Sequence, residues 1–298
     1  MTCRFLSDTL RERFGTKVYK LALRGGRTCP NRDGTVGTGG CIFCAEAGAG
    51  EFVGKGATLS EELADAKARV APKLSGVEKP LYIAYFQSFC ATYLPVEEMR
   101  ERFFGAIEDP EVAVLSVATR PDCLPPKVLE LLGELAKRKP VWVELGLQTA
   151  CDKTAERIRR GYSLSVYDRA VADLKAVGCE VITHMIVGLP EETAEDAVQT
   201  ARHIATVGSD GIKIHLLHVD RGTEMETMYQ SGLYTPMSLE EYGEILCRVL
   251  ESLPPDMTVH RITGDGDKRT LVAPLWSGDK KRVMNYLTAL LKERGLRP

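Results

Sequence analysis

Runs of apolar residues alternate with amphipathic segments along most of the chain. The runs are nearly continuous rather than alternating with polar residues, which is typical of strands covered on both faces. Because each run is followed by helical periodicity, the pattern predicts parallel strands joined by right-handed crossovers, either in a doubly wound sheet or in a full or partial (βα) barrel. The six predicted strands span residues 17–23, 81–86, 112–119, 141–148, 180–187 and 211–218.

The segments between the strands carry helix signals. Thr58 followed by Glu61, and Ser238 followed by Glu241, have the form of capping boxes. After the sixth strand the alternation stops, and residues 257–263 could add a strand beside it. We predict one structural domain, with residues 1–220 as the core and residues 221–298 as a C-terminal α/β extension. The predicted helices span residues 5–14, 58–74, 95–107, 127–138, 152–160, 166–177, 193–207, 224–230 and 238–252, with a last helix from residue 279.

The first predicted strand runs directly into a glycine-rich loop that holds Cys29, Cys41 and Cys44. Thiolates at this density suit a metal ion or an iron–sulfur cluster. Structural zinc usually has four ligands in two close pairs, whereas this loop offers one Cys-x-x-Cys pair and one distant cysteine. Cys3 could complete a zinc site as the fourth ligand. The loop follows the carboxyl end of a strand, where βα folds gather their chemistry. This position favours a four-iron cluster with one iron open to a small molecule.

Charge and composition narrow the class of protein. The nine cysteines, an odd number, argue against a disulfide framework and favour a reducing cytoplasm. The chain starts without a signal-peptide pattern and contains no apolar run long enough to cross a membrane. The net charge is −2, but residues 1–32 hold eight Lys and Arg against two acidic residues, and residues 258–298 hold nine against four. These basic ends form either a patch for a polyanion such as RNA or ordinary solvated faces.

The chain contains the motifs Thr28-Cys-Pro-Asn-Arg-Asp-Gly34, Gly39-Gly-Cys-Ile-Phe-Cys44, Thr119-Arg-Pro-Asp-Cys-Leu124, Val143-Glu-Leu-Gly-Leu-Gln-Thr149, Gly188-Leu-Pro190, Ile214-His-Leu-Leu-His218 and His260-Arg-Ile-Thr-Gly-Asp-Gly266. Together these motifs resemble the radical S-adenosylmethionine (SAM) superfamily, and within it the YtqA/YhcC-type subgroup. The resemblance implies a partial (βα)6 barrel of TIM type, a 4Fe–4S cluster on Cys29, Cys41 and Cys44, and SAM bound to the open iron. The first two cysteines are separated by eleven residues, where the superfamily usually has three, and this spacing matches the subgroup.

The resemblance also implies contacts to SAM. Backbone carbonyls after the second strand would meet the methionyl amino group, and residues on the fourth and fifth strands would contact the ribose and the adenine. A glutamate on the fourth strand should share the inward face of the glutamine that ends it, since the two are an even number of residues apart. The cofactor-binding residues predicted in this way are Phe86, Gln87, Ser88, Glu144, Gln148, His184 and Gly188.

Three basic residues at strand ends are candidates for substrate contact and catalysis. Arg120 follows the third strand, while Lys213 and His215 lie on the sixth strand and share a face. A basic cluster facing the cavity could hold a carboxylate or a phosphate. The histidine could equally be an ordinary core residue.

Three functions remain open from the sequence. The first is a radical SAM enzyme that acts on tRNA, converting a carboxymethylaminomethyl group of wobble uridine to an aminomethyl group, with flavodoxin or ferredoxin as electron donor. The second keeps the radical chemistry but acts on a small metabolite or porphyrin-like acid. The third is a non-catalytic, zinc-stabilised binding protein. In every case we expect the other cysteines to behave as small core residues.

Overall fold

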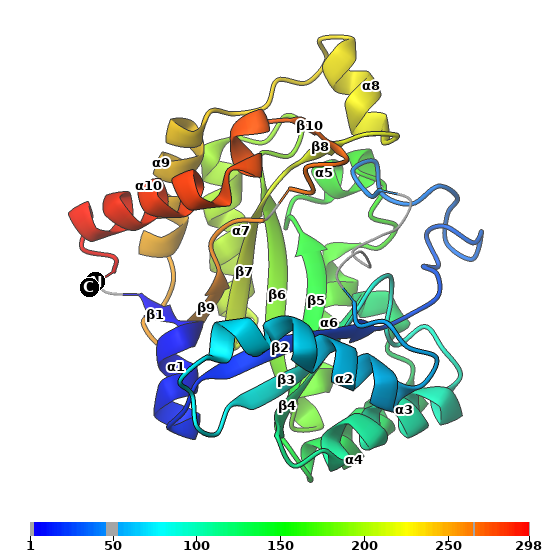
Figure 1. The fold of residues 1–298 in the computed structure, drawn as a ribbon. Coiled ribbons are helices and arrows are strands. Elements are labelled where there is room, and N and C mark those ends of the chain that lie inside the picture. The colour runs from blue at the N-terminus through cyan, green and yellow to red at the C-terminus, as the bar shows by residue number, and fades with distance from the viewer. Residues whose placement is uncertain (1–2, 46–52, 265, 298) are drawn as a thin grey trace.

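A curled sheet of eight parallel strands forms the centre of the protein (Figure 1). The computed structural model describes residues 3–45, 53–264 and 266–297. The strand order is β1-β9-β7-β6-β5-β4-β3-β2, so the sheet is an open half barrel with β1 and β2 at its edges. The strands are β1 (Arg4–Phe5), β2 (Val18–Arg24), β3 (Leu81–Gln87), β4 (Val112–Thr119), β5 (Val141–Gln148), β6 (Glu180–Val187), β7 (Gly211–Leu216) and β9 (Thr258–Arg261).

The six strands predicted from apolar runs are β2 to β7, which pair in sequence order. This confirms the predicted α/β half barrel of TIM type. The expected strand at residues 257–263 is β9, which pairs in parallel with β7. The two-residue strand β1 was not predicted, because two residues are too few to show a period. It pairs with β9 and extends the sheet beyond six strands.

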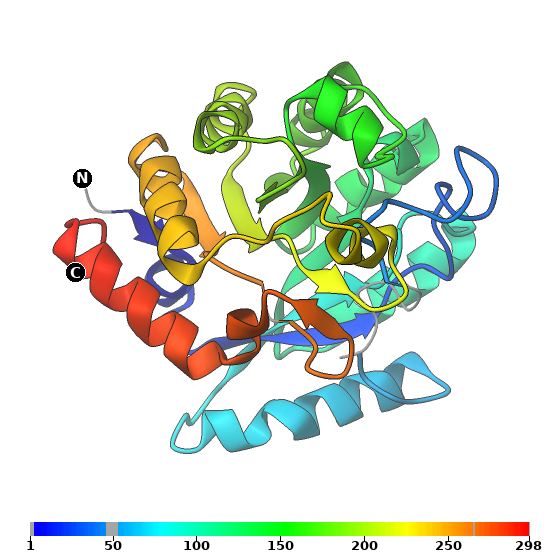
Figure 2. The ribbon, with the colours of Figure 1, turned by 90° about the horizontal axis from the view of Figure 1, so that it is seen from above.

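Helices cover the outer face of the sheet (Figure 2). Capping boxes at Thr58 and Ser238 are present as predicted, and Thr193 with Asp196 forms another. The helices on the barrel are α1 (Leu6–Phe14), α2 (Leu59–Val70), α3 (Val96–Glu108), α4 (Pro126–Ala136), α5 (Asp152–Arg157), α6 (Leu164–Ala176) and α7 (Ala194–Thr206).

The inner face of the sheet has an apolar layer at the amino-terminal ends of its strands. Ile83, Val114, Trp142 and Ile182 form this layer, and Leu10 of α1 is buried against it. Helix α1 therefore closes this end of the barrel with apolar side chains. The carboxyl end of the interior is left for polar residues.

The C-terminal extension begins where β7 ends. A short antiparallel pair, β8 (Val219–Asp220) with β10 (Leu271–Ala273), and helix α8 (Glu224–Gln230) lie at the carboxyl end of the barrel (Figure 1). Helix α9 (Leu239–Glu251) packs against α7, and α10 (Lys280–Glu293) packs on α9. The two chain ends meet beyond α10, since the Cys3 N–H donates to the Leu296 carbonyl (3.0 Å). A boundary at residue 220 stays a prediction. Among the described residues, no helix is both long and apolar enough to span a bilayer.

Candidate active site

The cysteine loop, residues 25–45, leaves β2 at the carboxyl edge of the sheet, as the sequence predicted. Asn31 holds the loop together from inside. Its side chain is buried, and its Nδ2 donates to the Arg159 carbonyl (2.6 Å) and to Cys41 Sγ (3.5 Å). A Cβ on Gly37 would lie 2.5 Å from Asn31 Oδ1, so glycine lets the loop close over the asparagine.

The C-terminal extension covers the cysteine loop. Ile42, between Cys41 and Cys44, is buried in an apolar cluster that also contains Leu189 and Met225. The backbone of Ile42 joins in, because the Met225 N–H donates to its carbonyl at 3.1 Å. The extension therefore fixes the Cys-x-x-Cys turn in place over the barrel.

The three loop cysteines are partly exposed and form no disulfide. Burial raises the pKa of Cys41 to about 11, and the neighbouring Cys44 and Cys29 add to the shift. The pKa of Cys29 is lowered to about 6, chiefly by a hydrogen bond from Cys90 and also by the positive charge of Arg120. The loop thus places its cysteine sulfurs near one another, with the positive charge of Arg120 beside Cys29. Such a set of sulfur ligands suits an iron–sulfur cluster.

Within the described ranges, no three His, Cys, Asp or Glu side chains converge on one point as the ligands of a single ion do. A four-iron cluster does not require this convergence, since each cysteine binds a different iron. Cys29, Cys41 and Cys44 therefore fit the cluster that the resemblance implies. Their role as cluster ligands stays a prediction.

Two cysteines that the sequence left isolated lie beside the loop. Cys90 and Cys123 are buried, and the Cys90 thiol contacts both Cys29 and Cys123. The three residues are far apart in sequence, but each follows the carboxyl end of one of three neighbouring strands, β2, β3 and β4. That shared position is the sequence signal that could have found them.

The segment after β3 is tied directly to the start of the cysteine loop. Gly25 N–H donates to the Gln87 carbonyl (2.6 Å), and Gly26 N–H donates to the Ser88 carbonyl (3.1 Å). The backbones cross so closely that a Cβ on Gly26 would lie 2.2 Å from the Cys90 carbonyl oxygen. Two of the carbonyls predicted to meet SAM are therefore already hydrogen-bonded to the cysteine loop.

The side chain of Phe86 turns away from the barrel interior and packs against Phe103 of α3.

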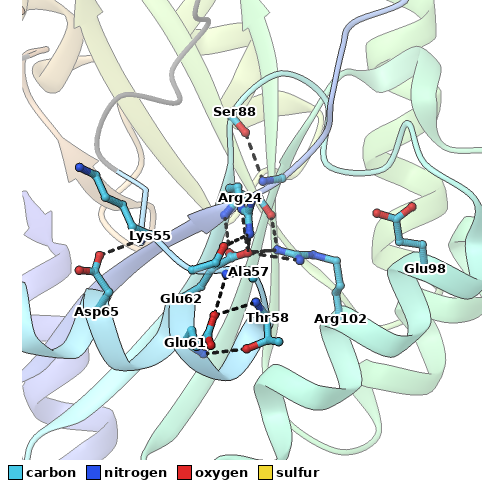
Figure 3. Close-up of polar contacts among 12 residues, drawn as sticks. Arg24, Lys55, Ala57, Thr58, Glu61, Glu62, Asp65, Ser88, Glu98 and Arg102 are labelled. Atoms are coloured by element: carbon cyan, nitrogen blue, oxygen red, sulfur yellow. Dashed lines mark hydrogen bonds and ion pairs between the residues drawn. The ribbon is translucent and has the colours of Figure 1, made fainter.

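A fully buried carboxylate, that of Glu62, lies close to the start of the cysteine loop (Figure 3). Glu62 of α2 accepts hydrogen bonds from Arg24 Nε (2.8 Å) at the end of β2 and from Arg102 (3.1 Å) of α3. This network joins two helices to the strand that leads into the cysteine loop, beside a cavity of about 610 Å³.

A second buried carboxylate, Glu144, lies at the centre of the barrel interior. It meets Lys20 (2.9 Å), Ser116 (2.8 Å) and His184 (2.8 Å), and it also pairs with Lys213. Burial opposes ionisation of Glu144, but the two lysines outweigh burial and hold its pKa well below the ordinary value. Burial lowers the pKa of Lys213 far below its usual range. Side chains from four other strands thus converge on the carboxylate of Glu144, and two of them are lysines.

Three histidines, His184, His215 and His260, also line this interior. The rings of His184 and His215 are 5.1 Å apart between centroids, and His260 of β9 packs edge-on against Trp142. Burial lowers the pKa of His184 to about 4 and that of His215 well below 6.5, so both are neutral at physiological pH. In the described part of the chain, the buried atoms His215 Nε2 and His260 Nδ1 have no hydrogen-bond partner. Because buried polar atoms normally have partners, these atoms mark a place for a ligand.

The other predicted cofactor residues lie at the carboxyl edge, near aromatic side chains. Gln148 ends β5 in a left-handed conformation (φ 64°), which only a strained or functional position usually adopts. The Tyr162 hydroxyl donates to the Gly146 carbonyl and lies 3.5 Å from Gln148 Oε1. The Gly188 carbonyl accepts from the Tyr234 hydroxyl at 2.8 Å. Both positions could border a bound nucleoside.

Arg120 is placed differently from the other basic candidates. Its guanidinium donates to Asp122 (2.6 and 2.9 Å) and to the Arg160 carbonyl (2.9 Å), and it stacks over Tyr162. Its hydrogen-bonding capacity is thus largely used within the protein, beside Cys29. The geometry brings Lys213 and His215 together with His184 and Glu144, whereas Arg120 lies with the cysteine loop.

The curled parallel half barrel and the cysteine loop at its carboxyl edge define an enzyme fold of the radical SAM type. Residues 26–204 match the model of the radical SAM superfamily, and residues 209–293 match that of the radical SAM C-terminal domain. The chain therefore belongs to the radical SAM superfamily.

Relatives support this over nearly the whole chain. YtqA of Bacillus subtilis is 44% identical over 97% of this chain and 89% of its own length, and YhcC of Escherichia coli is 38% identical over 96% and 91%. The archaeosine synthase subunit beta of Methanosarcina acetivorans is 26% identical over 78% and 68%. Among solved structures, Methanocaldococcus infernus Elp3 lacking its N-terminus shares the fold with a TM-score of 0.66, at 18% identity over 95% of this chain and 64% of that one.

Proposed function

We propose that this enzyme holds a 4Fe–4S cluster on Cys29, Cys41 and Cys44, reductively cleaves SAM, and modifies tRNA. The modification is the conversion of a carboxymethylaminomethyl group on wobble uridine to an aminomethyl group. Hydrogen abstraction from the carbon beside the amine, loss of a second electron to the oxidised cluster and hydrolysis of the resulting imine would release the carboxymethyl carbons as glyoxylate. The observation that supports the proposal best is the position of the cysteine loop in a radical SAM fold, at the open end of a half barrel whose interior is polar and basic.

A cluster held by Cys29, Cys41 and Cys44 would supply the electron for cleavage of SAM to methionine and a 5′-deoxyadenosyl radical. The chain's own residues bind and orient the reactants. The backbone of residues 86–88 lies against the cysteine loop, where it can accept a hydrogen bond from an amino group. Gln148 and Gly188 end the neighbouring strands β5 and β6, in reach of the same edge.

The barrel interior suits a substrate arm that carries a carboxylate. Lys20 and Lys213 both face one carboxylate, Glu144, and a further anion beside Lys213 would favour its protonated form, which burial disfavours. His215 Nε2, which has no partner in the described part of the chain, is available to the arm. Lys213 and His215 would hold the carboxylate while the neighbouring carbon reacts.

A nucleic-acid partner is supported by the chain ends and by one relative. The two basic ends lie side by side, since Cys3 bonds to Leu296 and Arg297 stacks over Phe5. Adjacent basic segments provide contacts for phosphates. The relative named for archaeosine, a modified nucleoside, supports a nucleoside substrate. We further propose flavodoxin or ferredoxin as electron donor, in the cytoplasm.

The test begins with anaerobic purification, iron counting, and addition of dithionite with SAM. We expect about four irons per chain and release of 5′-deoxyadenosine, both lost in Cys41→Ala and kept in Cys247→Ala, which changes a buried cysteine of α9. Colourless protein that stays inert to SAM after iron–sulfur reconstitution would overturn the proposal.

The substrate is tested separately. tRNA from a strain that lacks the gene should accumulate the carboxymethylaminomethyl form, and the purified enzyme should convert it. Binding should weaken steeply with salt, as phosphate contacts require. Unchanged tRNA in that strain, with active SAM cleavage by the enzyme, would instead favour a small acidic substrate.

A further inference from the structure

Two side chains that are not themselves predicted cluster ligands point at sulfur atoms of the cysteine loop. The first is Asn31, which is 4% exposed. Its amide group has two hydrogens: one is donated to the Arg159 carbonyl, and the other points to Cys41 Sγ at 3.5 Å. The bond to Arg159 fixes the amide, so the hydrogen on the sulfur side cannot easily turn elsewhere.

The second is Cys90, on the loop after β3. Its backbone N–H donates to the carbonyl of Thr28 (3.4 Å), the residue before Cys29, and its thiol contacts Cys29. Cys123, its other thiol neighbour, lies 3.9 Å from Asp122 Oδ1 and directs its own S–H there. Cys123 therefore stays a neutral thiol, which accepts a hydrogen bond more weakly than a cluster thiolate does, so the single S–H of Cys90 goes to Cys29 when Cys29 is deprotonated.

We propose that Asn31 and Cys90 donate hydrogen bonds to two of the three cluster thiolates and thereby raise the reduction potential of the cluster. Reduction adds negative charge to the cluster and its sulfurs. A hydrogen-bond donor stabilises the more negative state more strongly, so each donor makes the cluster easier to reduce. Asn31 and Cys90 act through the ligands and are positioning residues.

The inference rests on the proposed function, because it requires a cluster on Cys29, Cys41 and Cys44. The experiment measures the midpoint potential of the reconstituted protein by a redox titration that is monitored by electron paramagnetic resonance. Iron is counted in every sample. Cys90→Ala removes the donor, Cys90→Ser keeps a donor, and Asn31→Leu removes the amide. Cys179→Ala is the matched control. Cys179 is also buried, but it precedes β6 and therefore lies at the amino-terminal ends of the strands, away from the cysteine loop.

We expect Cys90→Ala to shift the midpoint potential to a more negative value, and Asn31→Leu combined with it to shift the potential further. Cys90→Ser and Cys179→Ala should stay near the unaltered protein. An unchanged or more positive potential in Cys90→Ala would overturn the inference, whereas absence of iron from the unaltered protein would overturn the proposed function instead.

Variants that lose the cluster are also informative. Loss of iron from Cys90→Ala, with iron retained in Cys90→Ser and Cys179→Ala, would agree with the inference, because only the variant without a donor fails. Loss of iron from Cys90→Ser as well would contradict it, since packing of the thiol would then matter more than the hydrogen bond. If Asn31→Leu does not hold iron, the Cys90 variants decide the question.

Discussion

Replacing Glu62 by glutamine tests how much one buried carboxylate at the start of the cysteine loop contributes to the stability of the protein. Glu62 is fully buried and accepts hydrogen bonds from the backbone and guanidinium of Arg24 and from the guanidinium of Arg102. Arg24 is the last residue of β2, and Gly25 follows it directly. Glutamine keeps the shape but loses the charge, and its NH2 group would face a guanidinium donor.

The expected loss of stability depends on how far the two arginine partners of Glu62 are exposed to water. Removing one partner of a buried ion pair costs about 3–5 kcal/mol, because the remaining charge is left buried. Here the side chains of Arg24 and Arg102 are 48% and 19% exposed, so water replaces part of the lost interaction. We therefore expect Glu62→Gln to lower the free energy of unfolding by about 2–3 kcal/mol and the melting temperature by about 5 °C.

The cavity beside Glu62 supplies a matched control. Glu98 pairs with Arg27, whose side chain is 75% exposed, and such surface pairs contribute less than about 1 kcal/mol. Urea unfolding of Glu62→Gln and Glu98→Gln, followed by circular dichroism, compares the two. Equal losses of stability in both variants would refute the reasoning, because burial of the carboxylate would then have no measurable effect.

Four further outcomes follow from the same structure. Gly26→Ala should destabilise the protein strongly and reduce iron loading, because its Cβ would lie 2.2 Å from the Cys90 carbonyl; thermal melting and iron counting check this. The pKa of His184 is about 4 when folded against 6.5 ordinarily, so the unfolded chain binds more protons between these values and stability falls as the pH falls through them; His184→Asn should flatten that fall in urea titrations. Lys213→Met should keep iron and 5′-deoxyadenosine formation but lose the tRNA product, as mass spectrometry of nucleosides would show. Ile42→Asp should lose iron, since it places a charge in the apolar contact between the cysteine loop and the extension.

Much of the scaffold could be predicted from local pattern. The strands β2 to β7 are long apolar runs, and helices α2 and α9 begin at the predicted capping boxes of Thr58 and Ser238. The cysteine loop was placed at the carboxyl edge because it follows a predicted strand. Strand β1 has two residues and no period, and its existence depends on a partner, β9, that lies far away in the sequence.

The chemical environment of the site could be predicted only in part. The alternation of a strand gave Lys213 and His215 a common face, and the structure brings them to Glu144 and His184. Lys20 was missed, because its distance from Glu144 depends on the curl of the sheet rather than on any spacing within β2.

The sequence by itself determined the order of strands and helices, the cysteine loop and its position after the first long strand, because these depend on neighbours along the chain. Tertiary structure alone decided which polar groups meet. The contact of Cys90 with Cys29 and the pairing of Lys20 with Glu144 join residues on different strands. Such contacts depend on the curvature and register of the whole sheet, and these are set by packing of the helices on its outer face and of α1 at its closed end.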